Sequence, residues 1–183
     1  MILPMPAEPR AIVVMGVAGS GKTAVARALA RQYGVAFLDA DDFHSADAKA
    51  RMRSGVPLTD AERAPWVDAL AAELRRLADA GRSSVLAYSG LRAMHRQRLR
   101  DSGVPLRFVF LHAPPHVIAA RLAVRTDHFM PPTLFASQLE ALQEPDGEAD
   151  VAWVDADRPL PEVVAHAVAA LARAWPAQTG ADD

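Results

Sequence analysis

The feature that most constrains this chain is the octet Gly16-Val17-Ala18-Gly19-Ser20-Gly21-Lys22-Thr23. It matches the pattern G-x-x-x-x-G-K-[ST] at every fixed position. A short apolar run over residues 11–15 precedes it and is typical of a buried strand, and a helical pattern over residues 24–33 follows it. This order of strand, loop and helix is the context that a phosphate-binding P-loop needs, so a plain glycine turn is the weaker interpretation.

Each part of the octet has an expected contact with a nucleotide. The glycines let backbone N–H groups surround a phosphate, and the following helix adds the positive end of its dipole. Lys22 is predicted to reach the β- and γ-phosphates of ATP, and the hydroxyl of Thr23 to ligate Mg²⁺. The octet alone indicates nucleotide binding and does not separate a kinase from a GTPase, a motor or a transport ATPase.

Composition narrows the class of protein. A length of 183 residues suits one domain. The formal net charge of −2 lacks the basic excess of a dedicated nucleic-acid binder, so no nucleic-acid partner is expected. The chain has no cysteine, which excludes disulfides and thiolate sites. No apolar run reaches about 18 residues, and residues 1–10 lack the pattern of a signal peptide, so we expect a cytoplasmic protein without a membrane partner.

Short apolar runs alternate with helical patterns along the chain. Strands are predicted at residues 11–15, 35–38, 84–88, 106–111 and 150–155, and helices at 24–33, 46–53, 60–80, 91–100, 114–124, 133–143 and 160–175. This alternation predicts an α/β fold in which helices cover both faces of a parallel sheet. We expect one domain over residues 11–175, tails at 1–10 and 176–183, and a mobile lid at about 121–132.

Acidic residues stand where the second strand ends. Asp39 and Asp41 follow its apolar residues directly, at the edge where open α/β sheets place their ligands. We interpret Asp41 as the group that accepts a hydrogen bond, or the proton, from an attacking hydroxyl. Asp39 is interpreted as a residue that holds Mg²⁺ through water. The competing interpretation is that these carboxylates only cap the next helix, as aspartates often do.

Basic and small residues are candidates for binding a small anionic acceptor. The planar fork of Arg63 suits bidentate pairing with a carboxylate, and an exposed salt bridge with Asp60 is the competing interpretation. Ser89, Gly90 and Arg92 follow the third strand, where a backbone turn and a cation could hold the polar groups of such an acceptor. Three further arginines are predicted to lie on the surface of the next helix: Arg96, Arg98 and Arg100.

Longer strings are shared with one family of enzymes. Besides the octet they are Asp39-x-Asp41-x-x-His44, Gly55-x-Pro57-Leu58-x-Asp60-x-x-Arg63-x-Pro65-Trp66, Arg121-x-x-x-Arg125-x-x-His128-Phe129 and Ser137-Gln138-x-x-x-Leu142-x-Glu144-Pro145. On these residues the chain closely resembles gluconate kinases of the thermoresistant type. The resemblance implies a nucleoside-monophosphate-kinase-like fold with sheet order 2-3-1-4-5. It also implies a homodimer that transfers the γ-phosphate of ATP to the 6-hydroxyl of D-gluconate.

The resemblance adds roles for two arginines and two histidines. Arg121 is implied to pack against the adenine and Arg125 to close over the transferring phosphate, although arginines four apart on a helix could also pair with acids in solvent. His44 is implied to donate to a substrate oxygen, where spacing alone fits a solvated neighbour equally well. His128 is implied to touch the substrate or to hinge the lid.

The chain departs from the family pattern near the expected acceptor. Ala48 stands where the family has asparagine, Ser45 replaces a proline, and Tyr88-Ser89-Gly90-Leu91-Arg92 replaces the family's Cys-Ser-Ala-Leu-Lys. These changes leave the ATP-binding motifs intact. Two other functions therefore stay open, namely a kinase of another small polyol acid such as shikimate and a nucleotide-binding protein that has lost catalysis.

Overall fold

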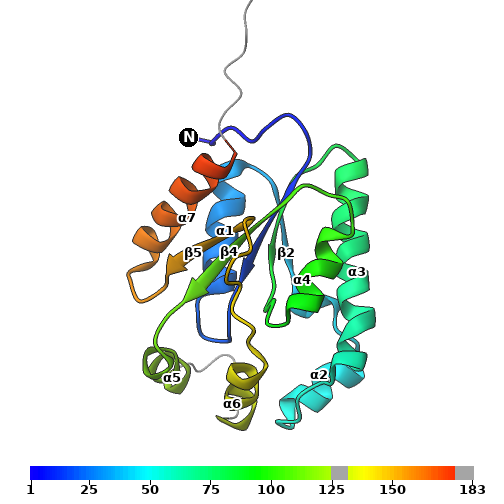
Figure 1. Cartoon of the computed structure of the whole chain (residues 1–183), viewed down its shortest axis with the longest axis vertical. Coiled ribbons are helices and arrows are strands. Elements are labelled where there is room, and N and C mark those ends of the chain that lie inside the picture. The colour runs from blue at the N-terminus through cyan, green and yellow to red at the C-terminus, as the bar shows by residue number, and fades with distance from the viewer. Residues whose placement is uncertain (125–131, 176–183) are drawn as a thin grey trace, which may run out of the picture.

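Five parallel strands form one sheet (Figure 1) in a computed structural model that describes residues 1–124 and 132–175. The strands are β1 (Ala11–Met15), β2 (Ala36–Asp39), β3 (Ser84–Ala87), β4 (Leu106–His112) and β5 (Val151–Asp155). Their order across the sheet is β2-β3-β1-β4-β5, and each neighbouring pair runs parallel. The predicted α/β fold and the strand order implied by the resemblance are confirmed.

The helices agree closely with the periodicity of the sequence. They are α1 (Lys22–Tyr33), the short 3-10 helix η1 (Ala40–Phe43), α2 (Ala46–Arg53), α3 (Asp60–Asp79), α4 (Ala93–Arg100), α5 (Pro115–Ala123), α6 (Pro132–Ala141) and α7 (Leu160–Ala174). The sequence did not predict η1, because four residues are too few to display a helical period. In the described part of the chain, none of these helices combines the length and apolar character needed to cross a membrane.

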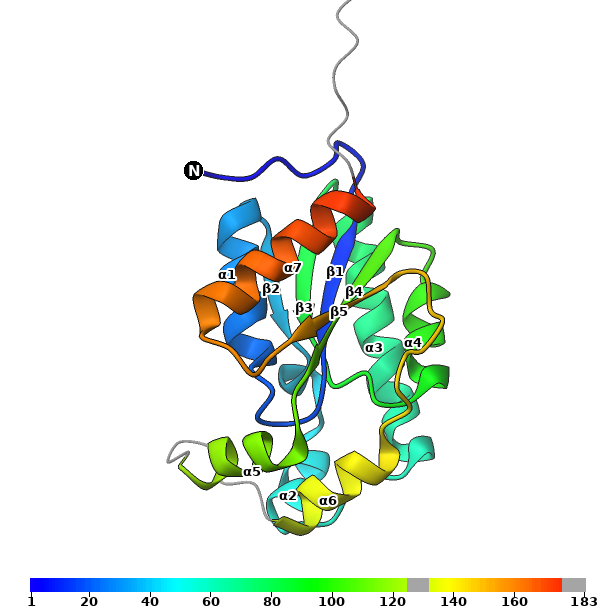
Figure 2. The ribbon, with the colours of Figure 1, turned by 60° about the vertical axis from the view of Figure 1, so that its left-hand side comes forward.

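Alternate residues of β1 enter two separate hydrophobic clusters. Val13 and Met15 pack with residues of α3 and α4, whereas Ile12 and Val14 pack with residues of α1 and α7. All four side chains are at most 1% exposed, and burying each one contributes roughly 1.5–3 kcal/mol. Figure 2 shows the corresponding helix pairs on opposite faces of the sheet. Because helices cover both faces of the sheet, a ligand must bind at an edge where the strands end.

A third, smaller hydrophobic cluster lies at the carboxyl edge of the sheet. It joins Val17 of the predicted P-loop, Leu91 after β3, Ile118 of α5 and Ala141 of α6. Figures 1 and 2 show α2, α5 and α6 gathered beyond this edge. The cluster therefore fixes α6 beside both the P-loop and the turn that follows β3.

Candidate active site

The predicted P-loop connects the end of β1 to the start of α1. Only glycine suits its first position, because Gly16 has a φ of +149° and an added Cβ would lie 2.7 Å from the carbonyl oxygen of Leu111. The N–H of Gly16 donates to the carbonyl of Ser89 at 3.1 Å. Nζ of Lys22 donates to the carbonyl of Val17 at 3.0 Å. The loop thus provides the tight backbone and the cation that a polyphosphate site requires.

Two oxygen-bearing side chains meet at the start of α1. Oγ1 of Thr23 donates to Oδ2 of Asp39, the last residue of β2, at 3.4 Å. The other carboxylate oxygen, Oδ1, accepts from the N–H of Asp41 at 3.1 Å and so caps η1. Asp39 therefore does cap a helix, and it also faces the P-loop. Mg²⁺ prefers a few such oxygen ligands together with waters and phosphates, so this pair fits the predicted metal position.

The segment around η1 places Asp41 and His44 near an aromatic platform. Asp41 lies in η1 and is exposed, and His44 follows at its end. The ring of His44 stacks on Trp66, with centroids 3.9 Å apart and planes 20° from parallel. Nε1 of the buried Trp66 donates to the carbonyl of Ala40 at 2.7 Å. Burial lowers the pKa of His44, and the nearby Asp41 carboxylate opposes this with a smaller effect. A neutral imidazole can donate at one nitrogen and accept at the other.

Arg63, Asp60 and Arg92 form a partly buried ionic cluster. Nη1 of Arg63 and Nε of Arg92 each lie 3.6 Å from Oδ1 of Asp60. These separations exceed a hydrogen bond, and within residues 1–124 and 132–175 neither Asp60 Oδ1 nor Arg92 Nε has a hydrogen-bond partner. The pair of Arg63 with Asp60 in the competing interpretation is present, with side chains that are 17% and 40% exposed, so Arg63 is the more buried partner. Two guanidinium groups around one carboxylate leave a net positive charge that suits an anionic ligand.

Two buried ring side chains border this cluster, and the sequence predicted no role for either. Tyr88 packs edge-on against Trp66, with centroids 5.2 Å apart. Burial raises the pKa of Tyr88, and Arg63 is close enough to oppose that rise. His95 of α4 is 2% exposed, and burial lowers its pKa while Asp60 opposes the change. Tyr88 and His95 therefore shape the surroundings of the cationic cluster.

The turn after β3 is held by a buried arginine. Nη1 of Arg96 donates to the carbonyl of Gly90 at 2.7 Å, and its Nε donates to both carboxylate oxygens of Glu148 at 3.1 Å. The prediction of a surface position is wrong for Arg96, which is 1% exposed. Arg98 and Arg100 are both partly exposed, with side chains that are 42% and 22% exposed, and Arg100 pairs with Glu148. A buried cation needs a partner, and here the partner is distant in the sequence.

The same turn is also held from the segment that follows α6. The N–H of Ala93 donates to Oε1 of Gln143 at 2.8 Å, and the N–H of Gln143 donates to the carbonyl of Leu91 at 2.7 Å. Gly90 has a φ of +61°, and an added Cβ would lie 2.7 Å from Sδ of Met15. The backbone at the predicted acceptor position is thus fixed from several directions.

Of the remaining candidates, only Arg121 is described. Arg121 lies in the last turn of α5, and its Nη2 donates to the carbonyl of Ala156, just after β5, at 2.7 Å. Arg121 therefore bonds a backbone carbonyl, whereas in the competing interpretation it would pair with an acidic side chain in solvent. Arg125 and His128, the other candidates of this region, lie outside the described residues.

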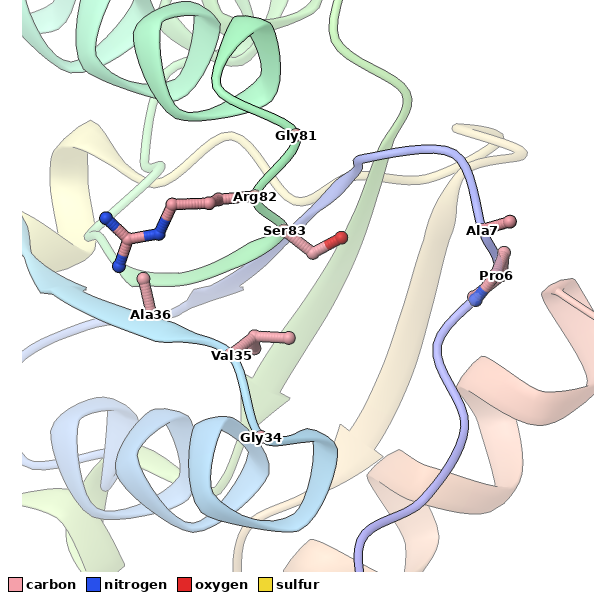
Figure 3. Close-up of a pocket in the computed structure, with 8 residues that line it drawn as sticks. All are labelled: Pro6, Ala7, Gly34, Val35, Ala36, Gly81, Arg82 and Ser83. Atoms are coloured by element: carbon pink, nitrogen blue, oxygen red, sulfur yellow. The ribbon is translucent and has the colours of Figure 1, made fainter.

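A pocket at the opposite edge of the sheet offers little chemistry. Figure 3 shows it between the N-terminal segment, the start of β2 and the turn before β3. Most of its lining is small or apolar, and Arg82 and Ser83 are the polar side chains. Oγ of Ser83 already accepts from the N–H of Arg10 at 3.2 Å. The candidate site is therefore the carboxyl edge, where the P-loop, the acidic residues and the cationic cluster meet.

The sheet order, the P-loop and the acidic residues at the end of β2 define a P-loop kinase. Residues 12–145 match a family described as an AAA domain. A gluconokinase of Gluconobacter oxydans is 40% identical over 157 residues, which cover 86% of this chain and 88% of the relative. The thermoresistant gluconokinase of Escherichia coli is also 40% identical, over 85% of this chain and 90% of its own. This chain belongs to the gluconokinase family.

Solved structures agree with this assignment. The crystal structure of a gluconokinase from Sinorhizobium meliloti superposes with a TM-score of 0.83 at 42% identity, over 92% of this chain and 95% of the other. An APS kinase from Mycobacterium tuberculosis has a TM-score of 0.65 at 23% identity. The second likeness concerns the fold alone.

Proposed function

We propose that the protein transfers the γ-phosphate of ATP to the 6-hydroxyl of D-gluconate, which gives 6-phospho-D-gluconate and ADP. Membership of the gluconokinase family supports this reaction. The observation that carries the proposal is the 3.1 Å hydrogen bond from the N–H of Gly16 to the carbonyl of Ser89. It joins the phosphate-binding loop to the turn that presents Arg92, so a nucleotide and an acidic acceptor would meet at one edge.

On the nucleotide side, the P-loop amides and Lys22 would hold the triphosphate. Thr23 would ligate Mg²⁺ and Asp39 would hold it through water, and the ion would supply charge neutralisation to the triphosphate when bound. We retain the implied roles of Arg121 at the adenine and Arg125 at the transferring phosphate as predictions. The residues thus position and neutralise the triphosphate and do no covalent chemistry themselves.

On the acceptor side, Arg63 and Arg92 would bind the carboxylate of gluconate, and Ser89 and Gly90 would contact its hydroxyls. Asp41 would accept the proton of the 6-hydroxyl while the oxygen of that hydroxyl forms a bond to the γ-phosphorus. The bond from that phosphorus to the β,γ-bridging oxygen then breaks, and ADP leaves. His44, neutral on its Trp66 platform, would orient a substrate oxygen, and His128 remains a predicted substrate contact.

A coupled assay of ADP release over a panel of sugar acids tests the proposed reaction. D-gluconate is expected to stimulate ADP release far above the rate without an acceptor. Stimulation by shikimate or another polyol acid in place of gluconate would identify a different acceptor. Binding of ATP without turnover for any acid would identify a nucleotide-binding protein that has lost catalysis.

The role of Asp41 is tested by Asp41→Asn. Loss of the proton acceptor is expected to lower kcat about 10²- to 10⁴-fold, while the Kd for MgADP stays within about twofold because Asp41 makes no proposed contact with the nucleotide. Asp42→Asn, at the neighbouring exposed residue, is the matched control. Full turnover in Asp41→Asn would remove the assignment.

The homodimeric state and the cytoplasmic location that the sequence led us to expect remain predictions. Light scattering coupled to size-exclusion chromatography measures the mass in solution directly. A mass of twice the 19.6 kDa chain is expected, and a mass of one chain would contradict the dimer.

A further inference from the structure

One peptide group of the P-loop makes a side-chain hydrogen bond at its carbonyl and another at its N–H. The carbonyl of Val17 and the N–H of Ala18 belong to the same planar amide. The carbonyl accepts from Nζ of Lys22 at 3.0 Å, and the N–H donates to Oε1 of Gln138 at 2.7 Å. Gln138 therefore connects to Lys22 through a single rigid unit, although the two residues lie far apart in the sequence.

The position of Gln138 is supported by packing. It lies on α6, and its side chain is partly buried. Ala141 of the same helix packs in the third hydrophobic cluster with Val17, whose carbonyl Lys22 contacts. Helix and loop are thus in contact through apolar side chains as well as through the hydrogen bond. The bond to Ala18 belongs to a packed interface and is not an isolated surface contact.

We infer that Gln138 is a positioning residue for nucleotide binding, which acts through the Val17–Ala18 peptide on Lys22. Rotation of that peptide would turn the Val17 carbonyl away from the ammonium group, and the bond from Ala18 to Gln138 prevents this rotation. Hydrogen bonds joined through one amide also polarise one another. This inference rests on the proposed function only for the identity of the ligand, a magnesium nucleotide.

The chemistry of the amide side chain suits this position. A side-chain amide oxygen accepts a hydrogen bond without carrying a charge. A carboxylate would accept the Ala18 N–H at least as well, but it would place a negative charge beside a loop that binds polyphosphate. Gln138→Glu is therefore expected to keep the fold and to weaken nucleotide binding. The added charge acts whatever the role of Gln138, so Gln138→Glu measures this electrostatic effect and the loss of positioning is measured by Gln138→Met.

The test is the Kd for MgADP, measured by titration calorimetry on the full-length chain, because this ligand binds without turnover. Gln138→Met removes the acceptor and is expected to raise the Kd about 2- to 10-fold, the effect of one neutral hydrogen bond. Lys22→Met is expected to raise it further. If Gln138 acts through Lys22, the double variant binds within about twofold of Lys22→Met alone.

Several outcomes separate the possibilities. Losses that add in the double variant, or an unchanged Kd in Gln138→Met, would overturn the inference. Failure of the wild type to bind MgADP would instead remove the proposed function itself. Gln97→Met is the matched control, since Gln97 is exposed on α4 and bonds Asp101 at 2.8 Å. Thermal unfolding checks that each variant is folded, and Gln138→Ala, which also removes the acceptor, provides the test if Gln138→Met is not.

Discussion

The hydroxyl of Thr23 lies 3.4 Å from a carboxylate oxygen of Asp39 and donates a hydrogen bond to it. Thr23 stands in the first turn of α1, and Asp39 ends β2, one of the two edge strands of the sheet. The contact therefore brings the last residue of the P-loop motif to an acidic residue from a separate strand. It is the clearest structural support for a magnesium position beside the phosphate loop.

Asp39→Asn tests this magnesium position. Asparagine still caps η1 and still accepts from Thr23, so the variant changes mainly the charge. We expect the free Mg²⁺ concentration for half-maximal activity to rise about tenfold, because a contact with a charged partner is worth about 1.5 kcal/mol or more. Activity is measured against Mg²⁺ at fixed ATP. Asp47→Asn, at an exposed residue of α2, is the control, and an unchanged Mg²⁺ requirement in Asp39→Asn would contradict the role.

Arg63→Lys tests the carboxylate contact. Lysine keeps the charge and loses the planar fork, so the KM for gluconate is expected to rise about 10- to 100-fold, as for a lost charge-assisted hydrogen bond. The KM for ATP should change less than about twofold, because Arg63 has no proposed contact with the nucleotide. Steady-state kinetics in both substrates measure the two constants. Arg75→Lys is the control on the same helix, where Arg75 is exposed and pairs with Asp79. A rise confined to the KM for ATP would reverse the assignment.

Arg96→Met tests the buried support of the turn after β3. Removing one partner of a buried ion pair leaves the other charge buried and unpaired. The free energy of unfolding is therefore expected to fall by about 3 kcal/mol. Arg98→Met, two residues along the same helix, breaks the exposed pair with Asp68 and is expected to cost at most about 1 kcal/mol. Urea unfolding at pH 7.5 measures both variants. Equal losses of unfolding free energy in the two variants would show that the burial of Arg96 adds nothing to stability.

His95 predicts a pH dependence of stability. Burial lowers its pKa in the folded state, so as the pH falls below about 6.5 the unfolded chain takes up the proton first. The stability that this residue contributes is complete above about pH 6.5 and is lost as the pH falls toward the folded pKa. His95→Leu should therefore show a smaller loss of unfolding free energy between pH 7.5 and 5.5, measured in urea. The same loss in wild type and variant would assign the pH dependence to other groups.

Much of the fold followed from local sequence signals. The continuous apolar run of β1, the octet and the apolar spacing in α3 are each local patterns within one strand, one loop or one helix. Their structures were therefore predicted within about two residues. The position of Asp39 at the carboxyl edge also followed from the sequence, because the carboxyl ends of parallel strands meet at one edge. The same carboxylate caps η1 and bonds Thr23, and its role at Mg²⁺ stays a prediction.

The contacts that the sequence did not reveal join distant segments. Arg96 is buried only because Glu148 supplies the opposite charge from 52 residues away. Gln138 reaches Ala18 across 120 residues, and no local pattern distinguishes it from an exposed helix glutamine. Asp60 looked like one half of a helix salt bridge, but it is shared by Arg63 and Arg92. Such partners are set by tertiary packing, which periodicity does not report.

The structure of the product tests the central claim most directly. ATP and uniformly ¹³C-labelled D-gluconate are incubated with the protein and Mg²⁺, and the product is analysed by phosphorus–carbon correlation in NMR spectra. The account predicts one phosphate ester, with its phosphorus coupled to C6 of gluconate, and no ester in Lys22→Met. The claim would be contradicted if the active wild-type protein formed no gluconate ester, or if it formed an ester at another carbon.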